Sequence, residues 1–313
     1  MSPGFLSVVI PAYNEAENIA GTIKDLKQVL GKSSVIRDFE ILVVDDHSSD
    51  GTFERVRALG DSKVRSMRLS RRSGSHTAIR AGLAHRRGDS ALCISADGQE
   101  ERGVLEPMFL KLQAGAHVVW GVRRQRQENF LARFFAALAY RIIISFSGVS
   151  SSNINLSKAN FFLLSKKVID AVNACPERNT SLLGLVLWVG FNQDFVEYDR
   201  QPRKAGTSKW SFRSRVRLFK DWVIAFSGVP LKLISWIGLA TAAAGFLYAF
   251  FILLYALFGH ATPGWAETTI LILILGGLQM LMLGVVGEYL WRTLDETRKR
   301  PLYFIEDSTG AGS

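Results

Sequence analysis

The sequence predicts an α/β domain built on a mostly parallel sheet, followed by two membrane-spanning helices near the C-terminus. Short apolar runs alternate with helical patterns from residue 6 to about residue 125, an order typical of parallel strand–helix–strand units. Two later runs, 233–258 and 268–286, contain no charged residue. With 313 residues and a mean hydropathy of +0.14, the chain is long enough and apolar enough for both parts.

Strands and helices can be assigned in order along the first part. Pro11 is expected to end the first strand. The other strands are short apolar runs, so the full set of predicted strands is 6–10, 39–44, 91–95 and 117–120. Apolar residues with helical spacing predict helices at 18–30 and 77–84. Loops that follow the strands of such a sheet are the expected ligand site.

The two uncharged runs predict a transmembrane hairpin. As helices they would be roughly 39 Å and 28 Å long at about 1.5 Å per residue, which matches a hydrocarbon core of about 30 Å. The alternative is a pair of buried helices, but a soluble core would have to cover two such runs joined by the short turn 260–267. We predict a hairpin over 231–291, with spans at about 233–258 and 268–288.

Basic residues flank the hairpin and are absent from its turn. They are Lys209, Arg213, Arg215, Arg217, Lys220 and Lys232 before the first span, and Arg292, Arg298, Lys299 and Arg300 after the second. Positive charge marks the cytoplasmic side of a membrane. The chain is therefore expected to be a multi-pass integral protein of the inner or plasma membrane, with both termini and a 292–313 tail in the cytoplasm.

Two further segments have the composition of interfacial amphipathic helices. In 211–230 an apolar stripe repeats every three or four residues beside basic positions, which predicts a helix in the headgroup plane. Segment 130–146 is apolar apart from Arg133 and Arg141, each costing about 2.5–3.5 kcal/mol at a bilayer centre, so an interfacial helix is favoured over a third span. A core helix of the soluble domain is the alternative for 130–146.

Charge and cysteine content limit the class of protein. The net charge of +10 is concentrated at the membrane boundary, and no nucleic-acid-reading motif is present, so no nucleic-acid partner is expected. Cys93 and Cys175 have no metal-ligand spacing and are expected to be reduced core residues. No cleavable signal peptide is expected at the N-terminus.

Polar side chains follow three of the predicted strands. Tyr13, Asn14 and Glu15 come after the first strand and offer stacking and hydrogen bonds to a base or ribose. Asp45 and Asp46 come after the second, where adjacent acids require compensation from a ligand's donors or from a helix cap.

The loop after the third strand carries a candidate metal site. Asp97 and Gln99 are hard oxygen donors two positions apart, a spacing that lets both reach one divalent cation. Diphosphate oxygens and water would complete its coordination.

Together these motifs resemble family 2 glycosyltransferases of the GT-A, Rossmann-like fold that use polyprenyl phosphate, such as bactoprenol glucosyltransferases and dolichol-phosphate mannose synthases. The resemblance extends from residue 5 to about residue 305. It rests on PAYNE, VVDDHSSDGT, SGSHTAIRAGL, SADGQEE, GVR at 121–123, PERN at 176–179, WVGF at 188–191, YDRQPRKAGTSKW at 198–210, GGLQML, GEYL and RKRPLY.

The resemblance implies a function and a set of site residues. It implies an inverting sugar transfer from a nucleotide-sugar to polyprenyl phosphate, in a cytoplasmic domain spanning 1–210, with Mg²⁺ or Mn²⁺ on the diphosphate. The residues expected at the nucleotide are Pro11, Tyr13, Asn14, Glu15, Asp45 and Asp46, and those at the metal are Asp97 and Gln99. The residues expected at the lipid phosphate and the leaving group are Arg123, Arg200, Arg203, Ser208 and Lys209.

The chain departs from the family pattern most at two places, while Glu100 in place of the usual Asp is a milder change. Ser95 stands where an acid is usual, and 160–163 reads Asn-Phe-Phe-Leu where Asp-Phe-Arg-Leu is usual. These departures motivate an alternative, a catalytically weakened membrane scaffold that partners a lipid-linked sugar flippase. A processive polysaccharide synthase would need a QxxRW motif and more spans, which the sequence lacks. Glycines in the second span, at 276, 277, 284 and 287, permit the close helix packing of a homo-oligomer.

Overall fold

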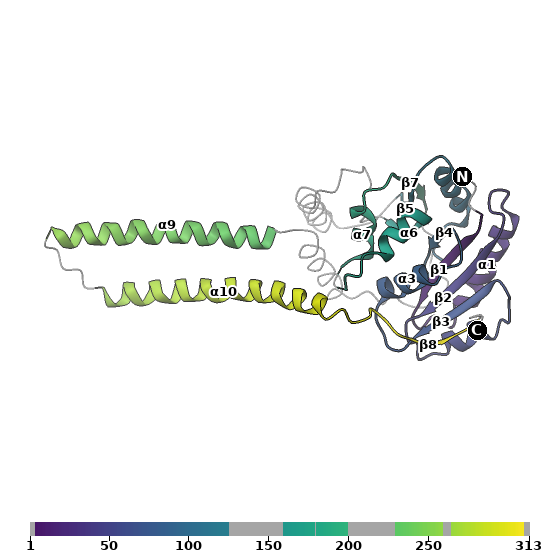
Figure 1. The fold of residues 1–313 in the computed structure, drawn as a ribbon, viewed down its shortest axis with the longest axis horizontal. Helices are drawn as coiled ribbons and strands as arrows, with labels where there is room; N and C mark the ends of the chain where they lie inside the picture. The colour runs from purple at the N-terminus through teal and green to yellow at the C-terminus, as the bar shows by residue number, and fades with distance from the viewer. Residues whose placement is uncertain (1–3, 125–158, 179, 200–228, 259–263, 310–313) are drawn as a thin grey trace. The chain divides into compact units, whose positions relative to one another are not determined.

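The computed structural model describes residues 4–124, 159–178, 180–199, 229–258 and 264–309 (Figure 1). The chain forms two compact units, the first made of Met1–Arg215 with Pro301–Ser313 and the second of Val216–Arg300. The predicted interfacial segment 130–146 and residues 211–228 of the segment 211–230 lie outside the described residues.

An eight-stranded mixed sheet forms the centre of the first unit, with the order β7-β5-β6-β4-β1-β2-β3-β8. β1, β2, β3 and β4 run parallel to one another, while β6 and β8 are antiparallel to their neighbours. The strands are β1 Leu6–Ala12, β2 Phe39–Asp45, β3 Val64–Leu69, β4 Ser90–Cys93, β5 Val118–Arg123, β6 Ala159–Ser165, β7 Gln193–Tyr198 and β8 Ile305–Ser308. The predicted mostly parallel α/β class is confirmed.

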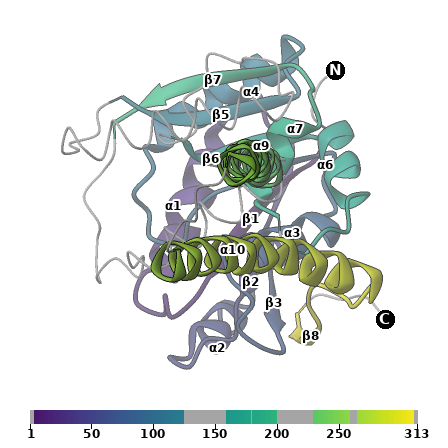
Figure 2. The same ribbon diagram turned by 90° about the vertical axis from the view of Figure 1, so that its left-hand side faces the viewer.

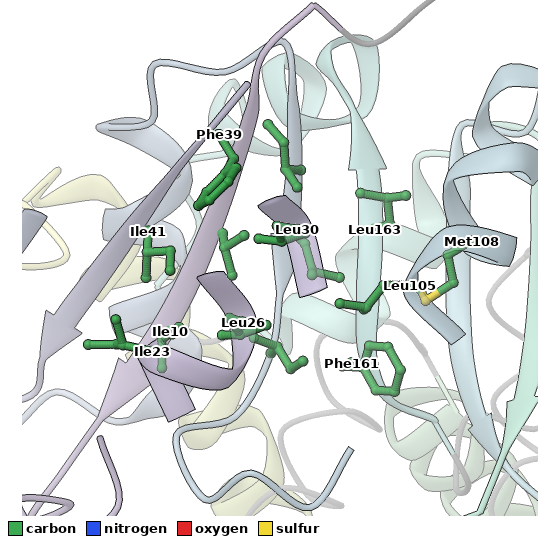
Figure 3. Packing of buried hydrophobic residues seen from close by; sticks show 14 of the residues in the cluster. Ile10, Ile23, Leu26, Leu30, Phe39, Ile41, Leu105, Met108, Phe161 and Leu163 are labelled. Carbon is green, nitrogen blue, oxygen red and sulfur yellow. The ribbon is translucent and has the colours of Figure 1, made fainter. Parts of the chain in front are cut away.

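Helices cover both faces of this sheet. The helices of the first unit are α1 Ile19–Lys32, α2 Thr52–Arg57, α3 Ser75–Ala84, α4 Leu105–Gln113, α6 Lys166–Asn173 and α7 Leu182–Trp188, with a 3-10 turn at Arg102–Val104. Figure 3 shows Ile23, Leu26 and Leu30 of α1 packed against the sheet, together with α4. These apolar positions recur every three or four residues, which places them on one buried helical face.

The first strand continues through Pro11 to Ala12, so the expectation that Pro11 ends it is wrong. Pro11 pairs with Val44 of β2, while pairing with β4 stops at Val9 and Cys93. Beyond that point β1 pairs with no strand on its β4 side among the described residues, and such a position tolerates a residue without an amide hydrogen.

The C-terminal segment returns to the sheet. β8 pairs antiparallel with β3, with Met67 opposite Ser308 and Arg68 opposite Asp307, and lies beside it in both views (Figures 1 and 2). The side chain and backbone of Thr309 bond the backbone of Ser66 at 2.8 Å each. The last strand of the domain is therefore separated from its partner by most of the chain.

The second unit contains α9 Val229–Leu257 and α10 Trp265–Thr297. Leu233–Ile252 and Ile274–Thr297 are long and apolar enough to cross a membrane. Large apolar side chains such as Trp236, Phe246 and Leu283 are exposed along these helices. An apolar surface of this extent is typical of a helix pair that contacts lipid. A Cβ added at any of the four glycines of α10 would meet nothing within 4 Å among the described residues outside the helix's own nearby backbone.

Gly82→Ala tests the close contact of α3 with the sheet. A Cβ at Gly82 would lie 2.3 Å from Cγ1 of Val9, so β1 and α3 would have to move apart. We expect a loss of about 1–3 kcal/mol in the free energy of unfolding of this unit, partly offset by better helix propensity. Gly21→Ala in α1 is the matched control, since its Cβ meets nothing within 4 Å, and should stabilise by about 0.5–1 kcal/mol. Equal melting temperatures for the two variants would contradict this packing.

Candidate functional site

Four strands bring their carboxyl ends to one edge of the sheet. β1, β2 and β4 are parallel neighbours, and β5 regains the same direction because it is separated from β4 by the antiparallel β6. The predicted loops at 13–15, 45–52 and 95–101, and Arg123 at the end of β5, therefore share this edge. This is where open α/β sheets bind their ligands.

Hydrogen bonds join the first two loops. The backbone N–H groups of Asn14 and Glu15 donate to the side chains of Ser48 and Thr52, each at 2.9 Å. In return the Asn14 side-chain oxygen accepts from the backbone of Ser49 at 2.9 Å. Asn14 has a φ of 53°, a left-handed conformation that asparagine tolerates. Asn14 thus fixes the two loops to each other, while the Glu15 carboxylate accepts from its neighbour Asn18 at 2.8 Å.

Asp45 lies entirely inside the protein, with 0% of its surface exposed. Its Oδ2 accepts from the backbone N–H of Ser48 at 3.1 Å and lies 3.7 Å from Nη1 of Arg68. Its Oδ1 is buried without a hydrogen-bond partner among the described residues. Desolvation raises the pKa of Asp45, while Ser48 and Arg68 act in the opposite direction.

Asp46 is also buried, with 3% of its surface exposed. Its two oxygens accept from the backbone N–H groups of Ser73 at 2.6 Å and Gly74 at 2.8 Å, just before α3. Desolvation raises the pKa of Asp46 despite these bonds. Protein donors thus supply much of the compensation that adjacent acids require, and a direct contact of either carboxylate with a nucleotide stays a prediction.

Tyr13 is half-buried and faces a cation. The guanidinium carbon of Arg72 lies 4.0 Å from the centre of the Tyr13 ring, a cation–π distance. Arg72 is exposed and adjoins Ser73, whose amide is held by Asp46. Arg72 therefore adds a positive side chain beside the predicted base-stacking residue, in a loop that the sequence analysis did not assign to the site.

The third loop places Ser95 between two carboxylates. Ser95 Oγ lies 2.6 Å from Asp97 Oδ1 and also bonds the Glu100 carboxylate. A hydroxyl can donate only one hydrogen, so a chain of two bonds requires one carboxyl group to be protonated. Burial raises the pKa of Glu100, while the hydrogen bond from Ser95 lowers it.

The residues of this loop fit a divalent cation that is shared with a diphosphate. The described part of the chain holds no group of three or more His, Cys, Asp or Glu side chains able to bind a metal. Mg²⁺, however, often takes only one or two protein carboxylates and fills its remaining positions with substrate phosphates and water. Asp97, which is partly exposed, suits that role, while Gln99 is buried and its backbone N–H lies 3.4 Å from Asp97 Oδ1, so its side-chain contact with a metal stays a prediction.

Arg123 ends β5 at the same edge of the sheet. Its Nε lies 3.4 Å from the hydroxyl of the buried Tyr198 at the end of β7. Phe162, at the position where the family pattern has arginine, is buried in β6, and its ring centre lies 5.4 Å from that of Trp120. Apolar packing thus replaces a charge there. Arg200, Arg203, Ser208 and Lys209 lie outside the described residues.

Two groups that lie near the strand-end loops were not predicted from the sequence. One is the loop at 70–74, whose arginines and glycine directly follow β3. The alternating run Val64–Leu69 could have revealed that strand. The other is Arg68 with the C-terminal strand β8, which no local pattern connects to Asp45.

Comparisons with known proteins agree with this architecture. The Glycosyl transferase family 2 profile matches residues 7–171. The "Uncharacterized glycosyltransferase YkcC" of Bacillus subtilis is 37% identical, covering 97% of this chain and 94% of that protein. The "Prophage bactoprenol glucosyl transferase homolog" of Escherichia coli is 35% identical, covering 96% and 98%.

Among solved structures, glucosyl-3-phosphoglycerate synthase of M. tuberculosis superimposes with a TM-score of 0.47 at 20% identity, covering 70% of this chain and 79% of that one. The family profile spans more than half of the 313 residues, and the two relatives match nearly the whole length. The chain belongs to glycosyl transferase family 2.

Proposed function

We propose that this protein transfers a sugar, with inversion, from a nucleotide-sugar to polyprenyl phosphate at the cytoplasmic face of the membrane, for modification of cell-envelope glycans. The observation that carries the proposal is the full-length similarity to bactoprenol glucosyl transferases. Two further features support it: the two long apolar helices, and the loops that follow β1, β2 and β4 at one edge of the sheet. By resemblance, UDP-glucose is the default donor and undecaprenyl phosphate the default acceptor.

The reaction would be a single displacement. A phosphate oxygen of the acceptor forms a bond to the anomeric carbon as the bond from that carbon to the nucleoside diphosphate breaks. The acceptor is already an anion at neutral pH, so we assign no general base. An α-linked donor would give a β-linked product.

The protein's role in this mechanism is to position two anions and to compensate their charge. Tyr13, Asn14 and Glu15, with the loop held by Asp45 and Asp46, are proposed to bind the nucleoside. Asp97 and Gln99 would hold Mg²⁺ or Mn²⁺ on the diphosphate. When bound, this ion acts as a Lewis acid that stabilises the leaving group.

Cationic residues are proposed to bind the acceptor. Arg123 lies at the carboxyl edge of the sheet, and the basic segment that follows β7 adds further charge. The residues proposed from that segment are Arg200, Arg203, Ser208 and Lys209. Basic residues flank both predicted spans. We propose that they hold the domain and both termini at the anionic cytoplasmic surface of the membrane.

A donor screen tests the proposal. Purified full-length protein, polyprenyl phosphate and Mn²⁺ are incubated with a panel of nucleotide-sugars, and released nucleoside diphosphate and labelled lipid are measured. We expect turnover with one donor, UDP-glucose being the first choice.

The second candidate function is the membrane scaffold, which Ser95 and the buried Phe162 favour. Absence of turnover with every donor would support the scaffold.

Arg203→Ala tests the acceptor assignment. Removal of a phosphate-binding cation should raise the KM for polyprenyl phosphate about tenfold, with a much smaller change for the nucleotide-sugar. Steady-state kinetics with each substrate varied in turn measures both. An increase confined to the KM of the nucleotide-sugar would instead move Arg203 to the donor site.

A further inference from the structure

The C-terminal strand places one carboxylate against the loop after β2. Glu306 of β8 accepts from Nε of Arg68 at 3.0 Å through its Oε2. The same oxygen lies 3.4 Å from Nδ1 of His47, which is 3.1 Å from the carbonyl oxygen of Leu69. A residue close to the C-terminus thus contacts the loop that follows Asp45 and Asp46.

Arg68 extends this contact to the buried acid. It sits opposite Asp45 in the β2–β3 register, and its side chain is 19% exposed. While Nε faces Glu306, Nη2 donates to the carbonyl oxygen of Ser48 at 3.1 Å and Nη1 lies 3.7 Å from Asp45 Oδ2. The planar guanidinium therefore joins β8 to both ends of the segment 45–48.

Asp45 depends on this cation more than an exposed acid would. The Asp45 carboxylate is completely buried, and its other hydrogen bonds among the described residues come from Ser48, which belongs to the same loop. Exposed Glu54 also lies 3.5 Å from Nη1 of Arg68, so Arg68 has an alternative partner that would draw it outward. Glu306, bound at Nε, keeps the guanidinium in the orientation that serves Asp45.

We propose that Arg68 and Glu306 are positioning residues for the nucleotide-binding loop, with Glu306 acting through Arg68 on Asp45 and Ser48. In this proposal β8 has two roles: it covers the edge of the sheet at β3, and it helps to form the site that binds the nucleotide-sugar. This inference rests on the proposed function, in which that loop binds the nucleoside diphosphate. Neither residue needs to touch the reacting atoms.

The neighbouring residue Asp307 offers a matched control. It lies on the same strand and pairs with Arg57 of α2 at 3.3 Å, and both side chains of this pair are largely exposed. The β3–β8 register is irregular at this point, with Asp307 opposite Arg68, but the Asp307 carboxylate accepts its hydrogen bond from Arg57. Asp307→Asn removes the same charge from the same strand without touching Arg68.

Nucleotide affinity of the full-length protein in detergent tests the inference. UDP, GDP, ADP, CDP and dTDP are titrated with Mn²⁺ by calorimetry, and the nucleotide that binds is used for all variants. We expect Glu306→Gln to raise its Kd roughly threefold to fivefold, the range for a partly exposed charge pair, and Asp307→Asn to leave it unchanged. Melting temperatures of the two variants should agree, since the β3–β8 backbone pairing is the same in both.

A double-mutant cycle separates action through Arg68 from independent action. Arg68→Gln should weaken binding about tenfold, and adding Glu306→Gln to it should cause no further loss. Additive losses, or equal effects of Glu306→Gln and Asp307→Asn, would overturn the positioning role. If the unaltered protein binds none of the five nucleotides, the donor half of the proposed function fails and the positioning role with it.

Discussion

Asp97→Ala should lower metal-dependent sugar transfer at least about 100-fold, the largest effect that we expect from a single substitution. Asp97 is a partly exposed carboxylate of the third loop, and its hydrogen bonds with Ser95 and the backbone of Gln99 orient it. Loss of this charge removes the main protein ligand proposed for the cation on the diphosphate. Radiolabelled transfer at several Mn²⁺ concentrations measures the effect.

Two controls accompany Asp97→Ala. Asp89→Ala removes an exposed acid at the other end of β4 and should leave turnover unchanged. Membrane insertion and the melting temperature of Asp97→Ala should match those of the unaltered protein, since this side chain is not part of the apolar core. Full turnover of Asp97→Ala, at any metal concentration, would refute the metal assignment.

Asp46→Ala should reduce kcat/KM for the nucleotide-sugar about 100-fold, even though Asp46 is buried. Its carboxylate holds the backbone N–H groups of Ser73 and Gly74, and so sets the position of the loop that carries Arg72. Misplacement of binding groups by about 1 Å can cost a factor of this size. Asp46→Asn keeps one acceptor oxygen and should lose less.

Kinetics with the donor varied, together with calorimetric binding of the nucleoside diphosphate, measures this effect. Asp89→Ala again serves as the control for charge. If Asp46→Ala binds the nucleotide as tightly as the unaltered protein does, the turn before α3 makes no contribution to the donor site.

Hydrophobic pattern was sufficient to predict β1, β2, β4 and β5, but not the parallel strands β3 and β7. Runs such as 39–44 are buried on both faces, and a strand of that kind has a sequence signature of its own. The partly polar run Val64–Leu69 was missed, because Arg65, Ser66 and Arg68 interrupt its apolar positions. β8 was missed for a stronger reason: all four of its residues are exposed, and its place depends on a partner more than 200 residues away.

The strand-end loops could be located from sequence, but their internal bonding could not. The adjacent acids at 45–46 correctly indicated a place where hydrogen-bond donors must compensate two buried carboxylates. The hydrogen-bond donors include the backbone N–H groups of Ser48, Ser73 and Gly74. Every residue type except proline has such a group, so the sequence does not reveal which ones donate. The direction of each carboxylate depends on tertiary contacts, and only the structure supplies these.

Because β8 pairs with β3, the sheet of this enzyme can be completed only late in its synthesis. Ribosomes make Arg68 early, yet its strand neighbour is 238 residues further along the chain, after both long apolar helices. Until β8 has been made, β3 is an unprotected edge able to recruit strands from other chains. Molecules that lack β8, whether nascent or clipped, should therefore be the aggregation-prone species, and the domain should mature only after β8 has been made.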